Sequence, residues 1–107
     1  MMTLKEIKTN KGATLNNQGE AVTYKTGFQV SKCDLYILPL KQLTKKLIKS
    51  ILTTLQENEH LGIWISGNRA YVDMSERIAN RAHALKIGRE RKQLSVWAWK
   101  KGEAVTC

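Results

Sequence analysis

The stretch GIWISGNRAYVDM, residues 62–74, decides the predicted fold, because two short apolar runs flank the turn-forming pair Gly67 and Asn68. Two β-rich runs joined by such a pair are typical of a β-hairpin. Side chains on a strand point alternately to the two faces of a sheet. Alternation therefore predicts that the hairpin has one aliphatic face and a second face that carries Trp64.

Apolar residues at helical spacing predict one helix on each side of this hairpin along the chain. The first covers residues 40–58 or 44–58, with Leu and Ile side chains on one face and lysines on the other. The second begins at a residue able to cap free backbone N–H groups, either Ser75 or Asn80, and ends near Arg91.

Further β-rich segments complete the pattern, at residues 21–31, 33–40, 93–99 and 104–107. The order is ββ-α-ββ-α-ββ, which predicts a single α+β domain over residues 21–107, with a mostly antiparallel sheet and two helices. Residues 1–20 are expected to form a flexible N-terminal arm or loop, since residues 9–20 are rich in Asn, Gly and Thr. The residues expected to form the main core are Leu47, Ile51, Leu55, Ile63, Ile65, Val72, Leu94 and Val96.

Positive charge dominates the composition, since 18 Lys and Arg against 9 Asp and Glu give a net charge of +9. This excess favours a polyanionic partner, although charge that only keeps a small protein soluble is the alternative. All the arginines lie between Arg69 and Arg91, and the planar guanidinium group suits phosphate and carboxylate. The residues predicted to contact a partner or nucleic acid are Lys41, Lys45, Lys46, Lys49, Arg77, Arg81, Lys86, Arg89, Arg91, Lys92, Lys100 and Lys101.

Strand alternation also gathers aromatic side chains on the sheet face opposite the aliphatic one, namely Tyr36, Trp64, Tyr71, Trp97 and Trp99. Three interpretations of this face stay open. A helix or the N-terminal arm covers the rings, which are then core. Alternatively, the face docks another protein or a second copy of the chain as a homodimer. In the third interpretation, nucleic-acid bases stack on the rings while basic side chains neutralise phosphates.

Several classes of function find no support in the sequence. His60 and His83 have no partner at metal-ligand spacing and no nucleotide-binding glycine motif occurs, so no enzyme, metal or cofactor is predicted. Cys33 and Cys107 are expected to be free thiols. No apolar run approaches the ~20 residues of a membrane helix, and the N-terminus lacks the pattern of a signal peptide. We therefore expect a soluble cytoplasmic protein with no membrane partner.

The segment GIWISGNRAYVDMSERIANRAHALKIGRERKQLSVWAWKKGEAV, residues 62–105, resembles a family of small proteins from phages and conjugative elements. The residues that carry the resemblance are Trp64, Tyr71, Asp73, Ala84, Gly88, Arg89, Gln93 and Leu94. The resemblance implies a provenance on a mobile element and names no activity.

From charge and resemblance together, we expect a non-enzymatic accessory protein that binds and inhibits a host protein or nucleoprotein through its basic surface. An anti-CRISPR protein or another anti-defence inhibitor acts in this way. The alternative is a protein that binds DNA or RNA directly through the same Lys and Arg residues.

Overall fold

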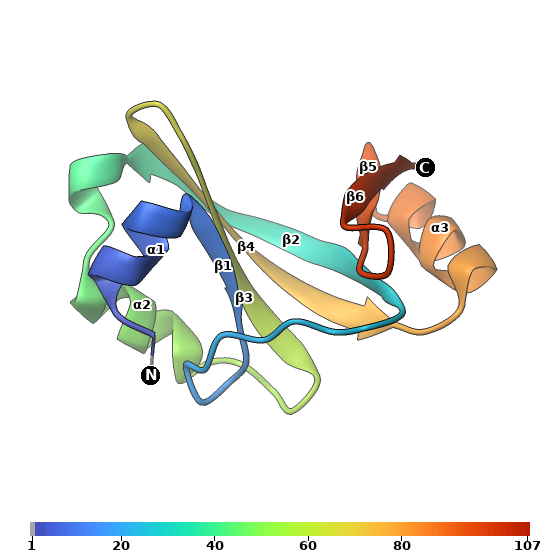
Figure 1. Cartoon of the computed structure of the whole chain (residues 1–107), viewed down its shortest axis with the longest axis horizontal. Coiled ribbons are helices and arrows are strands. Elements are labelled where there is room, and N and C mark those ends of the chain that lie inside the picture. The colour runs from blue at the N-terminus through green and yellow to red at the C-terminus, as the bar shows by residue number, and fades with distance from the viewer. Residues whose placement is uncertain (1) are drawn as a thin grey trace.

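The computed structural model describes residues 2–107, which form a six-stranded antiparallel sheet with three α-helices packed on one of its faces (Figure 1). The elements along the chain are α1 (Leu4–Asn10), β1 (Gly12–Leu15), β2 (Phe28–Pro39), the 3-10 turn η1 (Leu40–Gln42), α2 (Lys45–Leu52), β3 (Glu59–Ser66), β4 (Arg69–Ile78), α3 (Arg81–Glu90), β5 (Ser95–Ala98) and β6 (Glu103–Thr106). The strand order across the sheet is β1-β3-β4-β2-β5-β6. The α+β class and the antiparallel sheet are therefore as predicted, whereas the predicted order ββ-α-ββ-α-ββ with two helices is not, because the chain begins with a third helix, α1.

The hairpin that decided the prediction is present as β3 and β4. Gly67 adopts a φ of 57° in the turn, a conformation that glycine reaches without steric cost. The predicted helices also form, although the first is shorter than expected. Thr44 caps α2 and Asn80 caps α3, where the Asn80 side-chain oxygen accepts a hydrogen bond from the backbone N–H of His83. Ser75, the other candidate cap, lies within β4.

The prediction of a flexible arm over residues 1–20 fails for residues 4–15, which form α1 and β1. A capping box between Thr3 and Glu6 starts α1, and Ile7 turns into the core with no exposed surface. Gly12 then lets β1 approach β3 closely, because a Cβ at this position would stand 2.6 Å from the Ile63 carbonyl oxygen. The segment has few apolar residues and a loop-like composition. Its contacts with the rest of the chain nevertheless hold it in a helix and a strand.

The prediction of two strands over residues 21–31 and 33–40 is also wrong. A single strand, β2, spans 12 residues and pairs with β4 along its length. Its register shifts between Ser31 and Cys33 and again between Asp34 and Tyr36, at two β-bulges. A bulge adds one residue on one strand and leaves the pairing intact on either side. The interruption read from the sequence is therefore a pair of irregularities within one strand.

Two separate cores lie on the face of the sheet that the helices cover. The larger contains α1, α2 and the aliphatic side of the hairpin, and includes Ile7, Ile51 and Ile63. The smaller one is formed by Val30, Ala84 and Val96 with their partly buried neighbours, under α3. Figure 1 shows α1 and α2 at one end of the molecule and α3 with β5 and β6 at the other.

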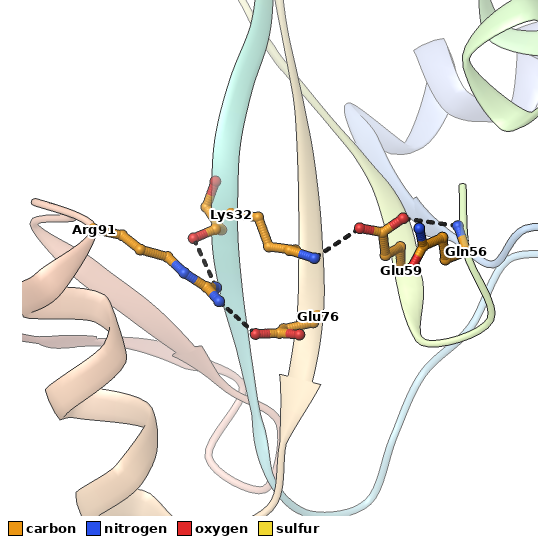
Figure 2. A network of polar contacts seen from close by, with 6 residues as sticks. Lys32, Gln56, Glu59, Glu76 and Arg91 are labelled. Carbon is orange, nitrogen blue, oxygen red and sulfur yellow. Dashed lines mark hydrogen bonds and ion pairs between the residues drawn. The ribbon is translucent and has the colours of Figure 1, made fainter. Parts of the chain in front are cut away.

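Charged side chains occupy the sheet between the two cores (Figure 2). Lys32 Nζ lies 2.7 Å from Glu59 Oε2, and Arg91 Nη2 lies 2.6 Å from Glu76 Oε1. The other Glu59 oxygen accepts a hydrogen bond from the backbone N–H of Gln56. These contacts satisfy the carboxylates on the same face of the sheet as the two apolar clusters, so a polar layer separates the cores.

Leu94 corrects the predicted core, because its side chain is 88% exposed. β5 begins only at Ser95; within it Val96 and Ala98 are buried, and Val96 belongs to the smaller core. The Leu94 backbone is nevertheless fixed, since its carbonyl accepts a hydrogen bond from the Cys107 N–H at 3.0 Å. The predicted alternation of side chains therefore holds within β5, but the strand begins at residue 95 and not at residue 93 as predicted.

Candidate binding surface

The sheet face opposite the helices, here called the open face, carries the aromatic side chains predicted from strand alternation. Trp64 lies directly opposite Tyr71, and Tyr71 lies directly opposite Ile37, across three neighbouring strands. The Trp64 and Tyr71 rings are 5.0 Å apart. Trp64 is 60% exposed and Ile37 is 61% exposed. These three residues form an exposed apolar row, here called the aromatic row.

Tyr36 was expected in this row, and the structure places Ile37 there instead. The second bulge of β2 precedes Tyr36, so that Tyr36 pairs with Val72 of the helix-covered face and Ile37 pairs with Tyr71. One extra residue in a strand exchanges the faces that all following side chains occupy. Tyr36 stays 47% exposed at this irregular position. Nothing in the spacing of the apolar residues marks the bulge.

The aromatic row has charges of opposite sign on its two sides. Arg69 lies on the open face two residues before Tyr71, at the hairpin end of β4. On the other side, Asp73 pairs with Asp34. Burial raises the pKa of the Asp73 carboxyl, and the charge of Asp34 acts in the same direction. The row is therefore apolar with one acidic flank, which disfavours a phosphate at that flank.

A second aromatic group lies farther along the open face, where β5 joins the sheet. Trp97 pairs with Gln29, which also pairs with Arg77 of β4. Because Arg77 and Tyr71 are six residues apart on a regular strand, Trp97 shares the face of the aromatic row, as the alternation predicted. Trp97 is 42% exposed.

Trp99 is held more firmly than Trp97. Its indole Nε1–H donates to Gln29 Oε1 at 3.1 Å, and the Gln29 amide donates to Ser75 Oγ at 2.9 Å. The ring of Tyr24, from the segment between β1 and β2, packs on Trp99 at 5.5 Å. The chain's own segment thus covers part of this aromatic group, in keeping with the first interpretation of the face, while Trp64 remains uncovered.

Tyr24 also closes over His60, the buried histidine of β3. The Tyr24 hydroxyl lies 2.6 Å from His60 Nε2, and the Arg77 guanidinium lies 5.2 Å from the centre of the Tyr24 ring. His60 is 3% exposed, and its burial lowers the pKa of the imidazole. The hydrogen bond and the burial give His60 a packing role, and sequence spacing gave no sign of its partner.

The predicted basic residues fall into two groups rather than one surface. Lys41, Lys45, Lys46 and Lys49 are exposed on η1 and α2, at one end of the molecule (Figure 1). The exposed residues of the other end, here called the basic end, are Arg81, Lys86, Arg89, Lys92, Lys100 and Lys101. Two predicted residues are engaged elsewhere, since Arg91 pairs with Glu76 and Arg77 donates to the backbone and side chain of Thr26.

Comparison with known proteins adds no relative. No protein-family model, curated protein or solved structure matches this chain. Within residues 2–107, none of the helices combines the length and the apolar character that crossing a membrane requires. The same residues contain no group of three or more His, Cys, Asp or Glu side chains placed to hold a metal ion.

Proposed function

We propose that this protein binds and inhibits a nucleoprotein of a bacterial host. The observation that carries the proposal is the basic end, whose six exposed Lys and Arg residues have no ion-pair partner within residues 2–107. The resemblance of residues 62–105 to proteins of phages and conjugative elements supplies the expected host.

The basic end suits the nucleic-acid part of such a partner. Its residues come from α3, from the turn that follows it and from the turn between β5 and β6. Glu90 is the one carboxylate in residues 81–101. Basic side chains that neutralise phosphates release condensed counterions, which makes binding strong at low salt and weaker as salt rises. A patch of this kind contacts a backbone without reading its sequence.

The aromatic row suits the protein part of the partner. Exposed Trp and Tyr side chains are enriched among residues that dominate the energy of protein interfaces. Trp64 and Ile37 lie beside Tyr71 on paired strands, so the row is preorganised and loses little conformational entropy on docking.

Affinity capture from host lysate, with and without nuclease, tests this proposal. A variant carrying Arg81→Glu, Lys86→Glu and Arg89→Glu should lose capture of the host nucleoprotein. Its matched control carries Lys41→Glu, Lys45→Glu and Lys49→Glu, which makes the same charge change at the opposite end of the molecule. Capture by the control and loss by the first variant support the proposal. Equal capture by both variants would exclude the basic end.

Direct binding of nucleic acid alone is the second candidate function. The exposure of Trp97 on β5, the strand followed by the turn with Lys100 and Lys101, favours it, because aromatic rings and cations together bind nucleic acids. Both candidates require the purified protein to bind nucleic acid at low salt, so affinity capture separates them. Capture of a host protein that survives nuclease treatment favours the first candidate, and capture that nuclease abolishes favours the second.

A further inference from the structure

We propose that Trp97 is the base-stacking residue of a site for single-stranded nucleic acid, located on the open face where β5 and β6 extend the sheet. The inference deepens the proposed function and rests on it, since it assigns a ligand class and a contact residue to the basic end.

The neighbours of Trp97 leave its ring accessible. Gln29 lies on one side and is 8% exposed, while Ala104 of β6 lies on the other side and offers only a methyl group. Trp99 meets Trp97 at an interplanar angle of 83°, with ring centres 6.4 Å apart. In a perpendicular pair, whichever ring presents its edge, at least one face of Trp97 stays uncovered by its partner. A planar base can therefore stack on it.

The structure also fixes the position of this ring. Trp99 is anchored by its bond to Gln29 and by Tyr24, and Trp97 packs on Trp99. The Arg77 guanidinium lies over the Tyr24 ring and donates a hydrogen bond to the Thr26 backbone carbonyl. A ring held in this way loses little freedom when a base stacks on it, so the stacking energy contributes to affinity.

The exposed charges that lie next to this aromatic group along the chain are positive. Lys100 and Lys101 follow Trp99 directly in an exposed turn, and Lys25 follows Tyr24. The nearest carboxylates along the strands point to the other face. Glu103 lies opposite Ala98, which is buried under the helices, and Glu76 pairs with Arg91.

The contrast with Trp64 decides which exposed tryptophan meets nucleic acid. Trp64 is more exposed than Trp97, but Asp34 and Asp73 flank its row. Asp73 lies four residues from Arg77 along β4, which corresponds to about 13 Å at the strand rise per residue. Phosphates beside the Trp64 row would meet the carboxylates of Asp34 and Asp73 as well as the Arg69 guanidinium, whereas Lys100 and Lys101, the exposed charges next to Trp97 along the chain, are both positive. The two tryptophans thus form a matched pair on one sheet face.

Single strands are the favoured form because stacking on a side chain requires an unpaired base with a free face. In a duplex both faces of each internal base are already covered by neighbouring bases. Sequence-tolerant proteins that bind single strands combine such rings with a basic groove. DNA and RNA share this chemistry.

The test measures fluorescence anisotropy of short labelled single-stranded DNA, single-stranded RNA and duplex DNA with the whole protein. Trp97→Leu keeps an apolar side chain and removes the aromatic ring, so we expect single strands to bind about tenfold more weakly. Trp97→Phe should retain most of the affinity. Trp64→Leu is the matched control: because this assay contains no host protein, the variant should bind the oligonucleotides like the wild type, whatever its effect on docking of a protein partner. Comparison of the affinities for single-stranded DNA and single-stranded RNA shows which of the two the site binds more tightly.

Thermal melts of each variant keep the comparison interpretable, and Trp97→Phe covers the case in which Trp97→Leu unfolds. Weaker single-strand binding for Trp97→Leu alone supports the site. Unchanged binding by Trp97→Leu, or equal losses for the Trp64 and Trp97 variants, would overturn it. Salt-dependent binding that treats duplex and single strands alike would also overturn the site, while leaving the basic end in its proposed role. A wild type that binds no nucleic acid at low salt would overturn both.

Discussion

Glu59 and Glu76 lie directly opposite each other on β3 and β4, and each carboxylate is paired with a base from another element (Figure 2). Like charges opposite each other in an antiparallel pair destabilise a sheet. Lys32 and Arg91 remove this repulsion. The sheet therefore carries its larger and smaller cores on either side of a charge-balanced layer.

The Lys32→Met variant should destabilise the protein by about 1 kcal/mol, because it leaves Glu59 without its charged partner beside Glu76. The Lys32 side chain is 34% exposed, so solvent screens the pair and keeps the loss modest. Urea denaturation measures the change. Lys46→Met, at an exposed position of α2, is the control and should stay within about 0.5 kcal/mol of the wild type. Equal stabilities for the two variants would contradict the role of the pair.

Protonation of Glu59 should contribute to the loss of folding stability at acid pH. The hydrogen bond from Lys32, followed by that from the Gln56 N–H, holds the pKa of Glu59 below its ordinary value of 4.5. A carboxyl with a lower pKa in the folded state contributes stability above its ordinary pKa, and this contribution disappears as the pH falls through the folded value. Glu59→Gln should therefore lose less stability than the wild type between pH 5 and about pH 3. A parallel decline of both proteins would rule out this contribution.

His60 should add a second pH dependence at a higher pH. Burial lowers the pKa of its imidazole below the ordinary value of 6.5, so the folded state favours the neutral ring. Stability is then complete above pH 6.5 and declines as the pH falls below it, where the unfolded chain binds a proton more readily. His60→Gln should flatten the profile from pH 7 to about pH 5, measured by denaturation at each pH. A pH profile that is unchanged in the His60→Gln variant would rule out this contribution.

Sequence patterns predicted the parts of the fold that local periodicity determines. The alternation around Gly67 located the hairpin and placed Trp64 beside Tyr71, because a regular strand keeps its period of two. Thr44 and Asn80 were each one of two possible helix starts in the sequence, and the structure selects them because their side chains satisfy free N–H groups locally.

Features that depend on distant contacts escaped the sequence. The bulge before Tyr36 forms against β4 and has no signature in the local pattern, so Ile37 replaced Tyr36 in the aromatic row. Basic residues read as one surface are divided between the two ends, because α2 and α3 pack on different parts of the sheet. This separation follows from the order of the strands, β1-β3-β4-β2-β5-β6, which local sequence patterns do not determine.

The N-terminal helix should be essential to the larger core. Ile7 is fully buried among residues of that core, so Ile7→Ala removes apolar contacts and leaves a cavity. Such a change typically costs about 2–5 kcal/mol. Lys8→Ala, at the exposed neighbouring position of α1, is the control and should change the free energy of unfolding by less than about 0.5 kcal/mol. Equal unfolding midpoints for both variants would mean that α1 is dispensable for folding.

Two residues of the final β-hairpin region test the boundary of the smaller core. Val96 is 2% exposed and packs with Val30 and Ala84, whereas Leu94 is 88% exposed two residues earlier. An aspartate at Val96 would bury a carboxylate without a partner, which costs several kcal/mol of a total stability of about 5–15 kcal/mol. We therefore expect Val96→Asp to unfold the protein or to lower its thermal midpoint by more than 10 °C, about 2 kcal/mol or more in a domain of this size.

Leu94→Asp introduces the same carboxylate at a position where water solvates it. The backbone hydrogen bond from Cys107 to Leu94 does not depend on the side chain, so it should persist in the variant. The thermal midpoint should stay within about 3 °C of the wild type, since exposed substitutions usually change stability by less than about 0.5 kcal/mol. Strand alternation alone makes the two positions equivalent, because both lie on the aliphatic side of the predicted strand. A Leu94→Asp variant that unfolds as Val96→Asp does would place Leu94 in the core and would contradict the observed start of β5.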